Sequence, residues 1–182
     1  MTGAGNSLGS SAVRLRRATL EDVETLTLWR SSTFYSGEFN DFGVKARLPV
    51  EESIKKNGLI TELGGTLIVE RADGKSVGSV SWRQVRYGPN PESVAWNIGI
   101  SLIPEARGRG FGSQAQRLLA EYLFASSTVN RVEAATDVDN LAEQRALEKA
   151  GFRRDGVLRG AQHRAGAWRD LAMYSILRDT HE

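Results

Sequence analysis

The chain has 182 residues, no cysteine and a formal net charge of only +2, with acidic and basic residues interspersed. The absence of cysteine excludes disulfides, thiolate metal sites and a cysteine nucleophile, and the lack of a basic stripe argues against a nucleic-acid partner. No apolar run approaches the roughly 18 residues that a membrane span needs, and the N-terminus has no signal-peptide core, so we expect a cytoplasmic protein without a membrane partner.

The N-terminal part of the chain predicts a tail, a strand and a helix. Residues 1–11 are rich in glycine and serine, and we expect a disordered tail there, with residues 12–182 forming one domain. The segment Val13–Arg17 alternates apolar and basic side chains, as a half-buried strand does. Thr19 can then cap a helix, because Asp22 stands in the capping-box position.

The middle of the chain predicts an irregular segment, a short helix and three strands. The irregular, aromatic-rich segment spans residues 31–48, and a helix is expected from Val50 to about Ile60. The dipeptide Asp73-Gly74 is the signal of a two-residue hairpin. The strands are expected at Thr66–Arg71, Ser76–Arg86 and, after a proline-rich turn, Val94–Ile103.

The most informative stretch, Arg107-Gly108-Arg109-Gly110-Phe111-Gly112, connects the last of these strands to an amphipathic helix, Ser113–Ala125. A glycine-dense turn of this kind leaves several N–H groups unpaired at the positive end of a helix, which favours an anion and most naturally a phosphate. Gly108 and Gly110 can adopt positive φ, and Gly112 keeps the first helical turn bare. The stretch lacks the lysine of a Walker loop, and its G-x-G-x-G spacing differs from the dinucleotide fingerprint.

After this loop the pattern predicts a strand, a helix and two closing strands. They are expected at Arg131–Thr136, Leu141–Ala150, Phe152–Arg159 and Leu171–Leu177. Asp137 and Asp139 are expected to cap the helix, and Gly151 to end it. Glycine- and tryptophan-containing turns are expected around the closing strands. This order indicates an α/β (α+β) fold, with a mixed, mostly antiparallel twisted sheet flanked by helices.

Three segments of the chain carry a resemblance to a known family. They are Trp96-Asn97-Ile98-Gly99-Ile100 running through Pro104 into the glycine loop, Asn130-Arg131-Val132-Glu133-Ala134 running through Asn140 into Leu147-Glu148-Lys149-Ala150-Gly151-Phe152, and Gly166-Ala167-Trp168-Arg169-Asp170 running into a strand with Tyr174. On these residues the chain resembles the GNAT superfamily of N-acetyltransferases, and within it the Rim-like branch of ribosomal-protein N-terminal acetyltransferases. The resemblance implies a single-domain GNAT fold and acetyl-CoA, or another acyl-CoA, as cosubstrate, with no metal.

The resemblance also implies which residues hold the cosubstrate. The backbone of Ile100 and Leu102 would pair with the pantetheine arm like an added strand, and Asn140 would hydrogen-bond near the pantetheine end. The pyrophosphate would be held by the backbone amides of Arg107, Gly108, Arg109, Gly110, Phe111 and Gly112. The physical chemistry agrees, because pantetheine amides suit β-type pairing and a pyrophosphate suits a helix N-terminus.

The acid/base residues of the relatives do not carry over intact. Many relatives have a glutamate on the strand before the loop where this chain has Asn97, and Rim-like enzymes often have a serine where it has Glu143. The glutamate of the next-to-last strand region aligns best with Gln162. Glu143 and His163 are the candidate general bases. The third alternative is that no residue acts as base, because the acceptor amine is already partly neutral.

The aromatic-rich segment is the expected wall of the acceptor site, because in GNAT folds the connection between the first two helices commonly covers that site. Tyr35, Glu38 and Asp41 are expected to bind a cationic amine, with Asn97 and Gln162 as further substrate contacts.

The sequence thus predicts an acyl-CoA-dependent N-acyltransferase that acetylates a primary amine of a small molecule or a peptide N-terminus. Two alternatives stay open: a longer acyl-CoA or an acyl carrier protein as donor, and, in another class, a non-catalytic CoA-binding regulatory module. Edge pairing through the last strands leaves a homodimer open as well.

Overall fold

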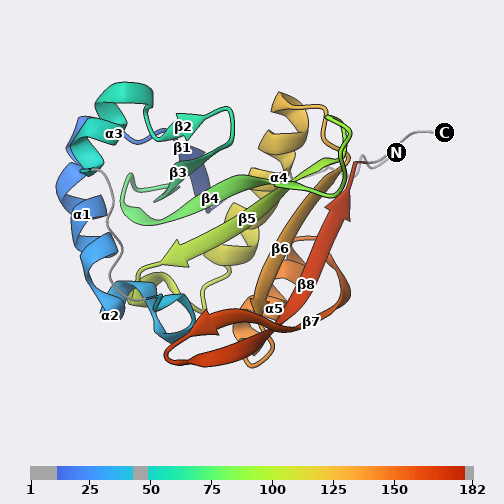
Figure 1. Cartoon of the computed structure of the whole chain (residues 1–182). Helices are drawn as coiled ribbons and strands as arrows, with labels where there is room; N and C mark the ends of the chain where they lie inside the picture. Colours follow the sequence, from blue (N-terminus) through green and yellow to red (C-terminus); the bar gives the residue numbers. More distant parts are fainter. Residues whose placement is uncertain (1–11, 43–48, 179–182) are drawn as a thin grey trace, which may run out of the picture.

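The computed structural model describes residues 12–42 and 49–178, and this part of the chain forms one eight-stranded sheet with helices on both faces (Figure 1). The strands follow the spatial order β1-β3-β4-β5-β6-β8-β7, and β2 pairs with β3. They are β1 (Val13–Arg16), β2 (Ile60–Thr61), β3 (Gly64–Arg71), β4 (Ser76–Arg86), β5 (Val94–Leu102), β6 (Arg131–Asp137), β7 (Arg153–Arg164) and β8 (Ala167–Leu177). The helices, with 3-10 turns written η, are η1 (Leu20–Asp22), α1 (Val23–Ser31), α2 (Thr33–Ser36), η2 (Glu38–Asn40), α3 (Val50–Asn57), η3 (Pro104–Ala106), α4 (Phe111–Ser126) and α5 (Leu141–Lys149).

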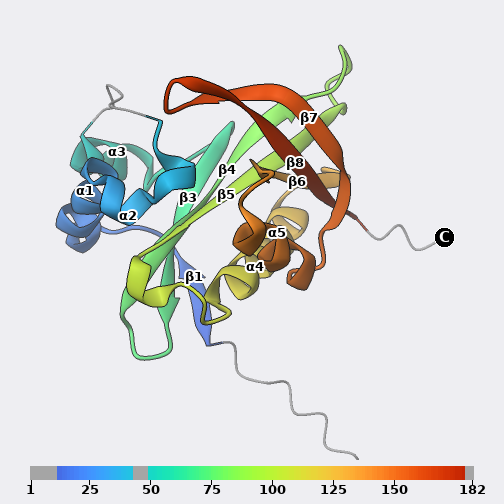
Figure 2. The ribbon, with the colours of Figure 1, turned by 90° about the horizontal axis from the view of Figure 1, so that it is seen from below.

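The two faces of the sheet are covered by different helices. Figure 2 shows α1, α2 and α3 on one side and α4 and α5 on the other. Alternate residues of a strand point to opposite faces, so Leu67 and Val69 of β3 enter the main core with Leu119 of α4. Ile68 enters the smaller core with Leu26 of α1. Strand β3 is therefore buried on both faces, and its Leu67–Val69 stretch is a continuous apolar run.

The sheet separates between β5 and β6. Every other neighbouring pair is antiparallel, whereas β5 and β6 are parallel and pair, within the described chain, over Trp96–Ile98 and Val132–Ala134. β5 continues to Leu102 on its β4 side, through pairs such as Val80 with Ile100. Beyond Ile98, β5 therefore pairs with β4 but not with β6 in the described chain, and its free backbone edge can pair with an added strand.

The predicted order of elements is confirmed except for the two-residue strand β2, which was not predicted, and the capping box is present. The Thr19 N–H donates to the Asp22 carboxylate at 2.8 Å. The helix expected to reach Ile60 is shorter and ends at Asn57, because Gly58 takes the left-handed conformation, with φ +63°.

Two predicted segments differ from the structure or lie outside it. The irregular segment expected at residues 31–48 contains the short helices α2 and η2, while residues 43–48 and the tail expected at residues 1–11 lie outside the described residues. Within the described ranges, no helix combines the length and the apolar character that a bilayer crossing demands.

The expectation for the last two strands was wrong in extent. β7 runs to Arg164 and β8 begins at Ala167, so a two-residue turn, Ala165-Gly166, replaces the longer loop that the glycines suggested. Both turn residues have positive φ, at +48° and +76°, which is the pattern of a tight hairpin turn. His163 and Trp168 consequently face each other as paired strand residues.

Candidate active site

A cleft of about 470 Å³ lies where β5 separates from β6. One wall is the end of β5 with the glycine loop and the first turn of α4; the opposite walls are α5 and the segment Gly37–Asn40. The predicted residues that the structure brings together here are Ile100, Leu102, Arg107, Gly108, Gly110, Gly112, Asn140, Glu143 and Glu38.

The loop has the backbone conformation that its glycines allow. Gly108 and Gly110 have φ of +69° and +79°, and Gly110 is the N-cap of the sixteen-residue helix α4. A Cβ at either position would meet no atom within 4 Å, so the backbone conformation, and not crowding, favours glycine there. The first helical turn has no side-chain cap, because Gly110 has no side chain, and Gly110, Gly112 and Ser113 line the cleft.

Arg107 connects the loop to the opposite wall. Its Nε donates to the Leu102 carbonyl at 3.0 Å, and its Nη2 donates to the Tyr35 carbonyl at 2.7 Å. A Cβ on Gly37 would lie 3.4 Å from the Arg107 guanidinium, so the small residue leaves room for this bridge. Arg109 instead lies over the Phe111 ring, at 5.4 Å from its centroid.

Helix α5 presents one polar face to the cleft. Asn140 is its N-cap and accepts a hydrogen bond from the Glu143 N–H at 3.2 Å, so the expectation that Asp137 or Asp139 caps this helix was wrong. Arg145 and Lys149 also line the cleft and were missed by the sequence reasoning. The i, i+4 spacing of these two cations was the available signal.

Glu143 is the titratable group that the cleft alters most. Burial raises the pKa of its carboxyl from the ordinary 4.5 to about 7, and the neighbouring Gln116 side chain partly offsets that rise. A carboxyl with such a pKa exchanges protons readily at neutral pH, as a general acid or base must.

The wall opposite the loop is held by a second arginine. Arg164 is 6% exposed; it donates to the Glu38 carbonyl at 2.9 Å and pairs with the Asp137 carboxylate. Its guanidinium also lies over the Phe39 ring, at 5.1 Å. The tip of the β7–β8 hairpin is thereby fixed to η2, as the approach of the two segments in Figure 1 shows.

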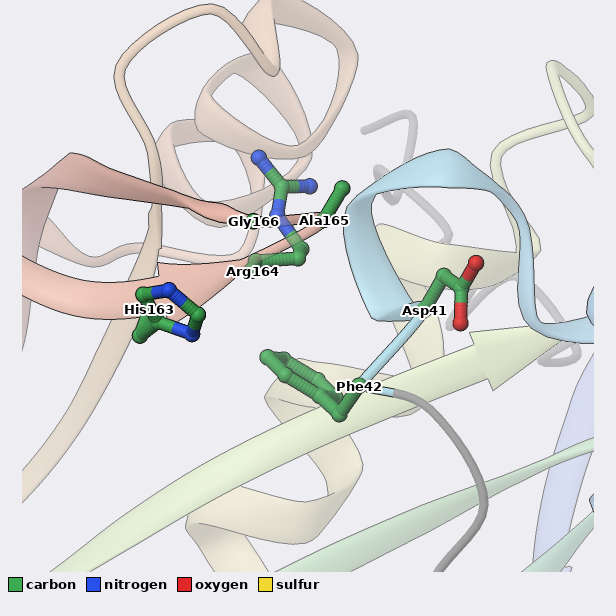
Figure 3. A pocket seen from close by; sticks show the side chains of 6 residues that line it. All are labelled: Asp41, Phe42, His163, Arg164, Ala165 and Gly166. Carbon is green, nitrogen blue, oxygen red and sulfur yellow. The ribbon is translucent and has the colours of Figure 1, made fainter.

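His163 lines a different pocket, of about 330 Å³ (Figure 3). That pocket is formed by Asp41, Phe42, His163, Arg164, Ala165 and Gly166. In Figure 3 the His163 and Phe42 rings flank the space. The His163 ring also packs edge-on against Trp168, which is 69% exposed. The structure therefore places Glu143 and His163 in separate cavities.

Asn97 and Gln162 are not among the residues that line either pocket. Asn97 donates to the Glu133 carboxylate at 3.3 Å, and Gln162 pairs with Arg169 in the hairpin. Glu133, a buried carboxylate that also accepts from the Tyr87 hydroxyl at 2.6 Å, was missed. The signal was a charged residue between apolar neighbours, Val132 and Ala134, of one strand.

Known proteins resemble this chain in sequence. The sequence model of the acetyltransferase (GNAT) domain matches residues 12–153. A probable N-acetyltransferase of Bacillus subtilis, YjcK, is 32% identical over 115 residues, which are 63% of this chain and 62% of that relative, so the match spans less than two thirds of it. The uncharacterized N-acetyltransferase p20 of Bacillus licheniformis is 25% identical over 94% of this chain and 96% of its own length.

Solved structures share the fold. The spermidine N-acetyltransferase of Vibrio cholerae in complex with CoA and spermine aligns with a TM-score of 0.72 at 20% identity, over 92% of this chain and 96% of that one. RimJ of Mycobacterium smegmatis in complex with CoA-disulfide aligns with a TM-score of 0.73 at 22% identity, over 91% and 81% of the two chains. At these identities the likeness shows the fold alone.

Proposed function

The chain belongs to the GNAT acetyltransferase family, and from this premise we propose that it transfers the acetyl group of acetyl-CoA to a primary amine. One observation carries the proposal: a single cleft combines a strand edge, a glycine loop at a helix N-terminus and a carboxyl with a pKa of about 7. These are the parts that bind an extended amide-containing arm, bind a phosphate and move a proton.

The residues present fit acetyl-CoA. The backbone of Ile100 and Leu102 would pair with the pantetheine amides, and the first-turn amides of α4 would hold the pyrophosphate. Arg145 and Lys149 add positive charge to the same cleft, which suits a polyanionic cosubstrate. When bound, acetyl-CoA supplies a thioester carbonyl that an amine can attack.

Glu143 would manage the proton. A primary alkyl amine is almost fully protonated at neutral pH, since the lysine ammonium has a pKa of about 10.4. The Glu143 carboxylate would take the proton from the ammonium nitrogen, directly or through water. As the C–N bond forms and the C–S bond breaks, the same carboxyl can return a proton to the departing sulfur. We favour Glu143 over His163 because Glu143 lines the proposed donor cleft, whereas His163 lines the neighbouring pocket.

The acceptor would approach along the wall formed by Tyr35, Glu38 and Asp41. Glu38 lines the cleft and Asp41 lines the neighbouring pocket, so this wall places carboxylates beside both cavities. Carboxylates suit a cationic amine, and both acceptor classes, small-molecule amines and peptide α-amines, present one. Among the structural neighbours, one is named a spermidine N-acetyltransferase and another a ribosomal L7/L12 α-N-protein acetyltransferase, which keeps both classes in the proposal.

The test is thiol release from acetyl-CoA in the presence of a panel of amines: polyamines, arylalkylamines and peptides with a blocked or a free α-amine. The proposal expects release that depends on one of these classes, with the acetylated product seen by mass spectrometry. CoA binding without transfer to any acceptor would instead favour the non-catalytic CoA-binding module. Transfer from longer acyl-CoAs or an acyl carrier protein, but not from acetyl-CoA, would replace the donor.

A further inference from the structure

Gln116 is a polar residue of α4 whose side chain is buried in the interior of the molecule. It is 1% exposed, and its neighbours on the helix, Ala115, Leu119 and Ala120, are buried apolar residues. Within residues 12–42 and 49–178, its Nε2 has no hydrogen-bond partner. A buried amide donor left unsatisfied is unfavourable, so such a group calls for a reason beyond packing.

Its neighbour across the α4–α5 contact is Glu143. The Gln116 side chain lowers the pKa of the Glu143 carboxyl, while burial raises it, and these are the two causes that set the value. The charged groups that line the cleft around Glu143 are Glu38 from η2, Arg107 from the loop, and Arg145 and Lys149 from α5. None of these charges contributes to the pKa of Glu143. Gln116 is therefore the polar group that acts on it.

We propose that Gln116 is a positioning residue for Glu143, whose amide N–H stabilises and orients the carboxylate form as it takes the proton from the acceptor amine. This inference rests on the proposed role of Glu143. The Gln116 side chain acts on the Glu143 carboxyl, yet within the described residues its Nε2 meets no partner at hydrogen-bond geometry, so ionisation of Glu143 would draw the two groups into a charge-assisted hydrogen bond and satisfy the unpaired donor. An apolar side chain of the same length could not do this.

The test is Gln116→Met, which keeps the volume of the side chain and removes the amide. The pH at which kcat reaches half of its plateau on the acid side should rise by about half to one unit, as expected for a lost hydrogen bond to the charged form. KM for acetyl-CoA should stay within about twofold of the wild-type value, because Gln116 lies outside the lining of the cleft. Gln114→Met is the matched control: Gln114 accepts from the Ala12 N–H on another side of α4, and its pH profile should match that of the wild type.

A second measurement separates this inference from the proposed function. The carboxyl carbon of Glu143 is titrated by NMR in the protein without substrates, where turnover is not needed. Gln116→Met should raise the titration midpoint of Glu143, and Gln116→Leu replaces this variant if it folds poorly. In a Glu143→Gln background, the Gln116 change should leave the remaining pH profile of kcat unchanged. An unchanged Glu143 midpoint would overturn the inference even if acetyl transfer is found, whereas a raised midpoint without turnover would leave it standing and remove the proposed function.

Discussion

Two parts of the cleft are built by different means: the proposed donor side, which is the end of β5 with the glycine loop and α4, and the proposed acceptor side, which is η2 with the tip of the β7–β8 hairpin. The donor side is mostly one continuous stretch, from the end of β5 through the glycine loop into α4, and it presents backbone groups. The acceptor side is assembled by arginines that reach across the chain. Arg107 and Tyr35 are 72 positions apart, and Arg164 and Glu38 are 126 apart. A site made of backbone is constrained by local conformation, whereas a site made by distant side chains can change its shape without altering the fold.

Glu143 is the side chain on the donor side that would act on the acceptor, and it should show the largest effect. Glu143→Gln should lower kcat by about 10²–10⁴-fold, the usual contribution of a positioned acid or base. The Kd of this variant for CoA should barely change, because the backbone groups proposed to hold CoA remain. In the wild type, kcat should rise with pH through about 7, as Glu143 ionises. The measurements are kcat as a function of pH and CoA binding by calorimetry. A loss of kcat in His163→Ala but not in Glu143→Gln would make His163, and not Glu143, the general base.

Arg164 tests whether the acceptor side depends on long-range contacts. Arg164→Met leaves the buried Asp137 carboxylate without its cation, which costs about 3–5 kcal/mol for a buried pair. It also removes the donor to the Glu38 carbonyl, so KM for the acceptor should rise more than KM for acetyl-CoA. Denaturant unfolding and steady-state kinetics provide the measurement. Arg164→Met with Asp137→Leu should recover much of the stability but not the acceptor KM.

The same Glu143 carboxyl makes stability depend on pH. Its pKa in the folded chain, about 7, lies above the ordinary 4.5, so the folded state binds the proton more tightly than the unfolded state. The stability linked to this proton is fully present below pH 4.5 and is lost as pH rises through 7. Relative to Glu143→Gln, the free energy of unfolding of the wild type should therefore fall by at most about 3 kcal/mol across that window. A constant difference between the two proteins from pH 4 to 8 would contradict the raised pKa of Glu143.

Two glycines test whether the donor side depends on backbone. Gly110→Ala places a side chain at φ +79°, which costs about 1–2 kcal/mol in conformation, although no atom lies within 4 Å of the new Cβ. Gly112→Ala introduces no such strain, and its Cβ would be 3.7 Å from the Leu102 side chain. Gly110→Ala should lower both stability and CoA affinity, whereas Gly112→Ala should weaken CoA on the order of tenfold, about 1.4 kcal/mol, without loss of stability. Thermal unfolding and CoA calorimetry on both variants separate the effect on stability from the effect on CoA binding.

This contrast also explains what the sequence could and could not predict. The loop, the strand edge and the capping box depend on residues close in the chain, so local pattern was enough for the order of the main elements and for most of the residues that line the cleft. The length of the β7–β8 hairpin was misjudged because Ala165 takes a positive φ, which few non-glycine residues do. The separation of His163 from Glu143, and the bridge from Arg164 to Glu38, depend on tertiary contacts that no spacing encodes.

Arg107 belongs to both sides, and its variants give the smallest but most discriminating effect. The resemblance places the Arg107 backbone amide at the pyrophosphate, where the guanidinium could add its charge, while the structure has the guanidinium on the Leu102 and Tyr35 carbonyls. Losing these exposed bonds should cost about 1 kcal/mol. Arg107→Lys keeps the charge but loses the planar fork, and Arg107→Met loses both.

If the hydrogen bonds of Arg107 to the two carbonyls matter most, both variants should raise the acceptor KM alike, by a few fold, and Arg107→Lys should bind CoA like the wild type. The opposite result is that both variants leave the acceptor KM unchanged and that Arg107→Met alone weakens CoA binding, in a salt-dependent way. Arg107 would then belong to the donor side, because salt screens a charge that acts on phosphate much more than it weakens a hydrogen bond to a carbonyl.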